Sequence, residues 1–272
     1  MIVITGATGN VGRPLVQALA AAGEVVTAVS RRRAEVPAGV RHVEADLSRP
    51  ETLEPAVEGA EAVFLLTGPE FLAGGNLNDV IKTIRAAGVE RTVLLSSQGV
   101  GTKRHPSDHE DAVTRSGLAW TILRPGNFNS NALQWAAAVR AQRAVEAPFA
   151  DVALPAIDPT DIAEAAAVVL TDPAHASNTY TLTGPAPISP RQQAHEIALA
   201  INEPVRFVEL TRTQARDRMT RHMPAPVADA TLDVLGSPST EEQQVSPDVE
   251  KVLGRPARTF AEWAGRNVGA FR

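Results

Sequence analysis

The sequence predicts an α/β protein with a doubly wound parallel sheet and a smaller C-terminal α/β lobe. Through the first half of the chain, short apolar runs alternate with longer amphipathic stretches, as in strands joined by helical crossovers. The runs at 63–66 and 93–95 lack polar alternation, which is typical of parallel strands covered on both faces. Gly23, Gly88 and Gly117 stand where three helices are expected to end, because glycine readily adopts the left-handed conformation that follows a helix.

The same patterns give the order of elements along the chain. Strands are expected near 2–5, 25–30, 41–44, 62–67, 91–96 and 119–123, with helices near 10–22, 50–58, 76–88 and 107–117. After these come a helix at 130–145, a strand at 152–155, a helix at 159–170 and a strand at 179–183. A C-terminal lobe then holds a helix at 189–201, a strand at 205–208 and a last helix at 259–268. We therefore assign residues 1–150 to the core and residues 151–272 to a mixed segment that completes the core and forms the small lobe, as one integrated unit.

Composition excludes several classes of function. The 272 residues include 26 Lys and Arg against 31 Asp and Glu, so a net charge of −5 provides no positive field for a nucleic acid. The absence of cysteine rules out disulfides, thiolate metal sites and thiol nucleophiles. Apolar runs fall short of the ~20 residues that span a bilayer, and the first residues lack the features of a secretory signal. We expect a cytoplasmic protein that binds neither nucleic acid nor membrane.

The strongest local signal is an apolar strand that leads into a glycine-rich turn and then a helix, at residues 3–15. Gly6 permits a tight turn, Gly9 lets the backbone approach a pyrophosphate, and Gly12 allows the helix to pack closely on the sheet. The amides at the helix start then face the anion. This arrangement predicts an NAD(P)-binding Rossmann core, and the alternative is a glycine-rich turn that binds no ligand. The expected cofactor contacts in the turn are Gly6, Thr8, Gly9, Asn10, Val11 and Gly12.

With this glycine spacing the chain resembles the NmrA-like family of atypical short-chain dehydrogenases/reductases. Further segments carry the likeness in the family's order: Ser96-Ser97, 116–126, 158–163 and 180–185. The resemblance implies two kinds of protein. One comprises quinone and dye reductases that use NADPH, and the other comprises catalytically silent regulators that sense the NADP(H) or NAD(H) state.

The cofactor preference is predicted from the residues after the second strand. Dinucleotide-binding folds place an acid there to bind the ribose 2′-hydroxyl, or an arginine to accept a 2′-phosphate. Arg31, Arg32 and Arg33 occupy this place with no acid beside them in the sequence, so NADPH is favoured over NADH. The alternative is an exposed basic loop in which Arg31 stacks on adenine without selecting a phosphate.

Other cofactor contacts are expected where later strands end, because open parallel sheets bind ligands at the carboxyl ends of their strands. Asp46 and Leu47 resemble the family's adenine contact, and for Asp46 an acid at a helix N-terminus is the competing explanation. In the resembling family the segment after Arg-Pro approaches the nicotinamide, which makes Asn127 a candidate carboxamide contact. The expected residues on the nicotinamide side are Thr67, Gly68, Ser96 and Asn127, with Pro69, Ser97 and Gln98 beside them.

The residues expected for carbonyl reduction are only partly present. Typical short-chain reductases place a Ser after the fifth strand, then a Tyr, then a Lys that lowers the pKa of the phenol. Ser96 and Ser97 match the Ser, but His109 stands at the Tyr position and Val113 at the Lys position. Ser96, Ser97 and His109 are therefore the candidate catalytic residues, and the alternative for His109 is a solvated side chain on its helix. For Arg124, pairing with Asp158 or Asp161 is favoured over substrate binding.

The loss of the Tyr and Lys limits the chemistry. Hydride transfer to a simple ketone creates an alkoxide whose conjugate acid is about as weak as water, so a positioned acid is needed. Transfer to a quinone creates a phenolate, whose conjugate acid has a pKa of roughly 10. Water or His109 can protonate such an anion. We therefore predict an NADPH-dependent oxidoreductase for a small, easily reduced acceptor, without a metal.

Two alternatives to this enzyme remain open. One is a non-catalytic NADP(H)-sensing regulatory protein, whose partner would be another protein, and the missing Tyr and Lys favour it. The other is an isomerase or epimerase with a retained cofactor, which normally needs a strong general base. For the oxidoreductase, the expected partner is a small-molecule acceptor, with a regulatory protein or a homodimer as further possibilities.

Overall fold

The structure is a computed structural model that describes residues 1–68, 71 and 74–272. The chain forms two compact units, each made of segments that are far apart in the sequence. The first unit comprises Met1–Pro125, Pro159–Leu182 and Pro247–Arg255, and the second comprises Gly126–Asp158, Thr183–Ser246 and Pro256–Arg272. Residues 126–150, expected in the core, lie in the second unit because the backbone there bonds within that unit, as Asn129 N does to Ile157 O at 2.8 Å.

The first unit contains a parallel sheet in which the described strands follow the order β3-β2-β1-β4-β5-β6-β8. The strands are β1 Ile2–Ile4, β2 Val26–Ser30, β3 Arg41–Glu44, β4 Ala62–Leu66, β5 Arg91–Leu95, β6 Ala119–Pro125 and β8 Asn178–Leu182. Each neighbouring pair is parallel. From β1 the chain runs outward to β3 and returns to add β4 on the other side, which is the reversal of strand order in doubly wound folds. The predicted fold class is confirmed.

Apolar side chains on both faces of the strands form the core of the first unit. All five residues of β2 are buried, whereas the edge strand β3 is exposed or half-buried throughout. Val63 and Leu65 of β4 belong to one buried cluster with Leu94 of β5 and with Val80 and Ile84 of a flanking helix. The sequences of these strands thus lack polar alternation because neither face of the strand contacts water.

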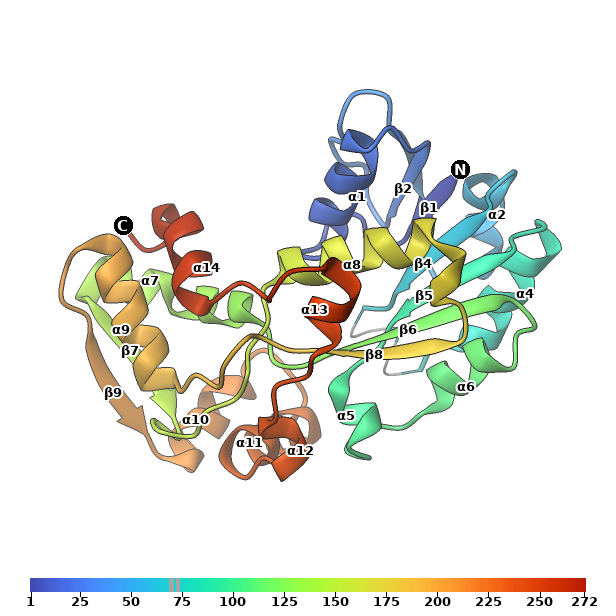
Figure 1. Ribbon diagram of the computed structural model, residues 1–272. Coiled ribbons are helices and arrows are strands. Elements are labelled where there is room, and N and C mark those ends of the chain that lie inside the picture. Colours follow the sequence, from blue (N-terminus) through green and yellow to red (C-terminus); the bar gives the residue numbers. More distant parts are fainter. Residues whose placement is uncertain (69–70, 72–73) are drawn as a thin grey trace. The chain divides into compact units, whose positions relative to one another are not determined.

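Helices flank both faces of this sheet (Figure 1). They are α1 Gly12–Ala21, η1 Pro50–Leu53, α2 Glu54–Val57, α4 Leu77–Ala86, α5 Gln98–Gly101, α6 Asp108–Thr114, α8 Pro159–Thr171, η3 Pro173–His175 and α13 Asp248–Leu253. Helices α1 and α8 contact each other on one face, and α4 and α6 contact each other on the other. Asp248 holds α13 at the edge strand, since its Oδ2 accepts a hydrogen bond of 2.8 Å from the amide of Thr181.

The second unit has a core of its own. Its elements are η2 Asn129–Trp135, α7 Ala136–Gln142, β7 Ala144–Pro148, α9 Pro190–Ile201, β9 Arg206–Leu210, α10 Arg212–Met219, α11 Ala225–Gly236, α12 Thr240–Gln243, α14 Phe260–Arg266 and η4 Val268–Ala270. Strands β7 and β9 form a parallel pair, and α9 packs on α14. Val139, Ile197, Phe260, Trp263 and Phe271 are buried together. None of the helices in the described residues of either unit is long and apolar enough to cross a membrane.

Two predictions for residues 130–155 are wrong. The helix expected at 130–145 is divided into η2 and α7, and β7 begins at Ala144. Arg143 ends α7 before β7, because its φ of 47° is left-handed and cannot continue a helix. The strand expected at 152–155 is also absent from this described segment, where Leu154 makes only an isolated bridge to Ile188. Helix α5, directly after β5, was not predicted.

Candidate functional site

The glycine-rich turn connects β1 to α1 and is fixed by bonds to the neighbouring strand. Thr5 Oγ1 donates to Phe64 O at 3.0 Å and accepts from Leu66 N at 2.8 Å, which ties the start of the turn to β4. Gly6 has a φ of 63°, a conformation that favours glycine. Helix α1 then begins at Gly12, after the N-cap residue Val11, which makes no side-chain capping bond.

The three glycines of the turn differ in how much room their surroundings leave for a side chain. A Cβ on Gly12 would lie 2.1 Å from Gly6 O, and a Cβ on Gly6 would lie 2.9 Å from Leu66 Cδ2, so both glycines are required by packing within the chain. A Cβ on Gly9 would meet only Gly6 O, at 3.3 Å. Thr8, Gly9 and Asn10 are exposed. The turn therefore presents an open backbone and an uncapped helix N-terminus, which fits the pyrophosphate of a dinucleotide.

The arginine segment follows β2, and all three of its side chains are exposed. The buried hydroxyl of Ser30 fixes its start, since Oγ donates to Arg32 O at 2.6 Å and lies 2.8 Å from His42 Nε2. In space, Asp46 lies near Arg31. Hydrogen bonds from Ser48 lower the pKa of Asp46, and the nearby charges of Arg49 and Arg31 lower it further.

Asp46 and Leu47 lie between β3 and η1. Asp46 Oδ1 accepts a hydrogen bond of 2.9 Å from Ser48 N, and Asp46 N donates one of 2.9 Å to Thr52 Oγ1. The carboxylate thus orders the turn before η1, whose N-cap residue is Arg49, so Asp46 is not the acid at a helix N-terminus that was the alternative to an adenine contact. Leu47 is half-buried and packs on the core of the first unit.

A buried ion pair joins the ends of β5 and β6 to α6. Glu110, only 5% exposed, accepts hydrogen bonds from Arg124 Nε to Oε1 at 2.9 Å and from Arg124 Nη2 to Oε2 at 2.5 Å. Ser96, directly after β5, donates its hydroxyl to Glu110 Oε1 at 2.5 Å. The hydrogen bond to Glu110 raises the pKa of Arg124. This pairing of an arginine with a carboxylate is bidentate and charge-assisted.

Glu110 was missed by sequence reasoning, and the partner of Arg124 was predicted wrongly. Asp161 pairs with Arg255 at 2.7 Å within the first unit, and Asp158 pairs with Arg266 within the second. A signal for Glu110 was present in the sequence. Residues i and i+3 share a helix face, and Glu110 stands three positions before the apolar Val113, which is buried, so burial of Glu110 could have been expected. A carboxylate on that face needs a cation, and Arg124 stands near the end of the strand that follows this helix in the sequence.

The other residues predicted on the nicotinamide side lie near strand ends in the first unit. Ser97 caps α5, and its Oγ accepts a hydrogen bond of 3.1 Å from Gly99 N. Thr67 and Gly68 follow β4 and are half-buried, and Pro69 lies outside the described residues. His109 on α6 is half-buried, with its ring centroid 5.5 Å from that of Phe71.

Asn127 lies in the second unit, where it lines a pocket of about 540 Å³. Asn131 Nδ2 donates to Asn127 Oδ1 at 2.6 Å. The walls of the pocket are largely apolar and aromatic, with Phe128, Trp135, Phe149, Leu154, Leu210, Met219 and Met223 among them. Polar groups are fewer, and two of them, Glu146 and Arg218, form an ion pair of 2.5 Å. This size and lining are typical of small-molecule sites.

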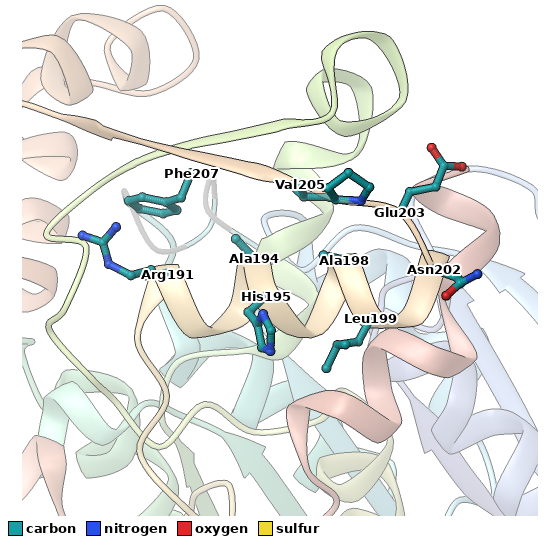
Figure 2. Close-up of a pocket in the computed structure, with 10 residues that line it drawn as sticks. Arg191, Ala194, His195, Ala198, Leu199, Asn202, Glu203, Val205 and Phe207 are labelled. Carbon is teal, nitrogen blue, oxygen red and sulfur yellow. The ribbon is translucent and has the colours of Figure 1, made fainter.

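A second hollow of about 530 Å³ in the same unit is lined by α9 and the segment leading into β9 (Figure 2). Arg191 points toward Phe207, and its guanidinium lies 5.0 Å from the ring centroid. Arg191 also pairs with Asp151 at 2.8 Å, and Glu203 pairs with Arg143 at 2.6 Å. Because these charges are already paired, this hollow is a weaker candidate for binding a polar ligand.

A protein-family model described as NAD(P)H-binding matches residues 6–173. The chain belongs to this family. The match begins at the glycine-rich turn and includes every described strand of the sheet except β1 and β8. The predicted resemblance to NmrA-like proteins is confirmed, and by family the chain is an NAD(P)H-binding protein.

Two relatives and one solved structure match over almost the whole chain. A (4-alkanoyl-5-oxo-2,5-dihydrofuran-3-yl)methyl phosphate reductase of Streptomyces griseus is 34% identical, covering 100% of this chain and 99% of the relative. An NAD(P)H azoreductase of Xenophilus azovorans is also 34% identical, with coverage of 100% and 99%. The NADPH complex of a quinone oxidoreductase of Escherichia coli has a TM-score of 0.81 at 25% identity, covering 98% of this chain and 99% of that structure.

Proposed function

We propose that the protein transfers hydride from NADPH to a small conjugated acceptor, such as a quinone, without a Tyr and Lys pair. The main support for this proposal comes from two residues of helix α6. The position expected for Tyr holds His109, which packs beside Phe71, and the position expected for Lys holds Val113, which is fully buried. An uncharged buried side chain cannot lower the pKa of a neighbouring acid, so the acceptor must form an anion that needs no strong proton donor.

The names of the relatives support an acceptor of this class. They describe reductases of an acyl-substituted unsaturated lactone, of azo compounds and of quinones. Each of these acceptors is conjugated, so the charge left by hydride addition is shared over several atoms. An anion such as a phenolate has a conjugate acid with a pKa of roughly 10, and water can protonate it.

The two sets of site residues have different tasks in this proposal. When bound, NADPH supplies the hydride. The turn at Gly6, Gly9 and Gly12 would hold its pyrophosphate, since the backbone there is open and the helix N-terminus attracts an anion. The apolar pocket beside Asn127, in the second unit, has the size and lining to hold a planar acceptor.

The preference for NADPH over NADH is supported by the exposed arginine segment. Replacing Arg31 and Arg32 together by alanine is expected to weaken NADPH binding by about 2 kcal/mol or more, and NADH binding much less, because only NADPH carries the 2′-phosphate. Fluorescence titration with each cofactor measures this difference. Arg85→Ala is the control, since Arg85 is an exposed cation in the last turn of α4, outside the glycine-rich turn and the arginine segment. Equal weakening of both cofactors would contradict phosphate selection.

Oxidation of NADPH in the presence of benzoquinone and naphthoquinone tests the reaction itself. We expect turnover above the rate without enzyme. NADPH binding without turnover on quinones, azo dyes and unsaturated lactones would contradict the oxidoreductase. It would favour the second candidate, an NADP(H)-sensing regulator, which the absence of Tyr and Lys at positions 109 and 113 also fits.

A further inference from the structure

The pocket beside Asn127 contains one cation, Arg218 of α10, among the described residues that line it, and all of these belong to the second unit. We propose that the guanidinium of Arg218 binds an anionic oxygen group of the acceptor, such as a sulfonate or a carboxylate. The pocket would then select planar conjugated acceptors that carry a negative charge. The inference rests on the proposed function, because it takes the occupant of this pocket to be the acceptor.

The guanidinium of Arg218 is held by a single hydrogen bond. Its Nη1 donates to Oε2 of Glu146 on β7 at 2.5 Å, and within residues 1–68, 71 and 74–272 neither Nε nor Nη2 has a hydrogen-bond partner. Nε and Nη2 form the edge of a guanidinium that binds two oxygens of one anion side by side. The edge suited to an oxyanion is therefore open in Arg218, while the bond from Nη1 restrains the side chain.

Other arginines of the second unit show how this edge is used when a carboxylate lies against it. In three of them, Nε and Nη2 donate to the two oxygens of one carboxylate at 2.6 to 3.3 Å, in the pairs Arg143 with Glu203, Arg191 with Asp151, and Arg216 with Asp229. Arg218 differs from these three, because its carboxylate partner lies at Nη1. A second anion can thus bind at Arg218 without displacing Glu146.

The surroundings of Arg218 fit an acceptor with an apolar ring system. Two ion pairs hold α10 against α11, Arg216 with Asp229 at 2.7 Å and Arg212 with Asp233 at 2.8 Å. Met219, the next residue of α10, lines the same pocket as Phe149, and both pack on a cluster that includes the buried Leu210. The pocket therefore combines an apolar wall for a conjugated ring with an open fork of donors for a charged substituent.

Calorimetry with naphthalene-2-sulfonate and naphthalene-2-sulfonamide tests the assignment without turnover. The two molecules share a ring system, and at neutral pH only the sulfonate is charged. Arg218→Met should weaken binding of the sulfonate by roughly tenfold or more, because a hydrogen bond to a charge is lost, and binding of the sulfonamide by about fivefold or less. Arg218→Lys should restore only part of the affinity for the sulfonate, because an ammonium has no planar fork.

The matched control is Arg212→Met on the same helix, since Arg212 pairs with Asp233 and is not among the described residues that line the pocket. It should leave the binding of both molecules unchanged. Unchanged binding of the sulfonate by Arg218→Met, or equal weakening of sulfonate and sulfonamide, would overturn the proposed anion site.

A second set of variants separates the donors of Arg218 from repulsion by Glu146. Arg218→Met leaves the carboxylate of Glu146 without its partner, and this charge by itself repels a bound anion. In protein that already carries Glu146→Gln, Arg218→Met should still weaken binding of the sulfonate by roughly tenfold or more. If the loss disappears in this background, repulsion caused it and the inference fails. Both side chains are partly exposed, so thermal unfolding should show that all these variants remain folded.

Kinetics with 1,2-naphthoquinone-4-sulfonate and the uncharged 1,2-naphthoquinone connect the anion site with the reaction. With NADPH as the donor, Arg218→Met should raise KM for the sulfonated quinone roughly tenfold more than KM for the uncharged one. If binding of naphthalene-2-sulfonate depends on Arg218 in a protein that reduces no acceptor, the proposed function fails and the anion site stands. If the protein reduces naphthoquinone but its binding of the sulfonate does not depend on Arg218, the inference fails and the proposed function stands.

Discussion

At the scale of single residues, two glycines of the glycine-rich turn have different roles: one is needed for packing, and the other for binding a ligand. Gly12 has no room for a side chain, because a Cβ would lie 2.1 Å from Gly6 O. Gly9 is exposed, and a Cβ there would be 3.3 Å from that same carbonyl oxygen. The absence of a side chain at Gly9 is thus explained better by the approach of a ligand than by the fold.

Substitutions at these two glycines should have different effects. Gly12→Ala should lower the free energy of unfolding by about 3 kcal/mol, because the backbone of the turn must move to make room. Gly9→Val should cost less stability than Gly12→Ala, because its Cβ contact with Gly6 O is longer, but it should abolish binding of NADPH and NADH, because its side chain occupies the path of the pyrophosphate. Thermal unfolding and cofactor fluorescence measure both effects. Normal cofactor binding by a folded Gly9→Val protein would show that the turn does not hold a dinucleotide.

Glu110 illustrates a second residue-scale effect, the cost of leaving a buried charge without its partner. Glu110→Ala removes both acceptors of the Arg124 guanidinium, whose side chain is 27% exposed. We expect a loss of about 3 kcal/mol in the free energy of unfolding, measured with urea. The matched control is Asp111→Ala on the same helix, which breaks an exposed pair with Arg115 and should cost less than about 1 kcal/mol. Equal losses in the two variants would contradict a structural role for the buried pair.

At the scale of elements, the sequence predicted the first unit better than the second. The strands of the parallel sheet were predicted within about two residues, because their apolar runs have few polar interruptions and glycines stand after the helices. The segment after Pro125 was harder. Its alanine-rich stretch favours a helix, but the left-handed conformation of Arg143 ends α7 and permits β7 to pair with β9. That pairing joins residues about sixty positions apart, and no local pattern reveals it.

In the candidate site, too, features that are local in the sequence could be predicted, whereas a contact between distant residues could not. The glycine turn and the arginine segment are local in the sequence, and both could be found from spacing and charge. The partner of Arg124 could not, because Glu110, Asp158 and Asp161 are all acids at plausible distances along the chain. All three acids are buried, so burial does not distinguish them either; the packing of α6 on β6 is what brings Glu110 to Arg124.

The packing of β8, η3 and α13 gives a pH prediction for Tyr180, the only tyrosine of the chain. Burial raises the pKa of its phenol, and the charges of Asp248 and Asp172 raise it further. His175 Nδ1 lies 2.7 Å from the phenol oxygen, and the Lys251 ammonium lies 5.5 Å from the ring centroid. The neutral phenol is thus favoured in the folded state, so its contribution to stability is present below about pH 10 and is lost as pH rises through the folded pKa.

Tyrosinate absorbance measures this shift directly. The folded protein should titrate above the midpoint of the urea-unfolded chain, which is expected near ~10. Tyr180→Phe should remove the entire signal and serves as the control. Coincident titrations of folded and unfolded protein would contradict burial of the phenol in the native state.

At the scale of the whole molecule, the candidate cofactor turn and the candidate acceptor pocket belong to different compact units. The turn and the arginine segment are parts of the first unit, and the pocket beside Asn127 is lined only by residues of the second. Each unit has its own buried core. A substitution in the pocket should therefore change the use of acceptors without changing the fold around the glycine turn.

Filling the pocket tests this separation. Met219→Trp adds volume to its lining and should raise KM for naphthoquinone at least several-fold more than for the smaller benzoquinone, while the NADPH dissociation constant stays the same. The control is Leu199→Trp in the hollow of Figure 2, where the leucine is 60% exposed and a larger side chain has room in solvent. KM values that respond to Leu199→Trp and not to Met219→Trp would assign the acceptor to the hollow at α9. A matching change in NADPH affinity would instead show that the two units do not divide the binding of cofactor and acceptor between them.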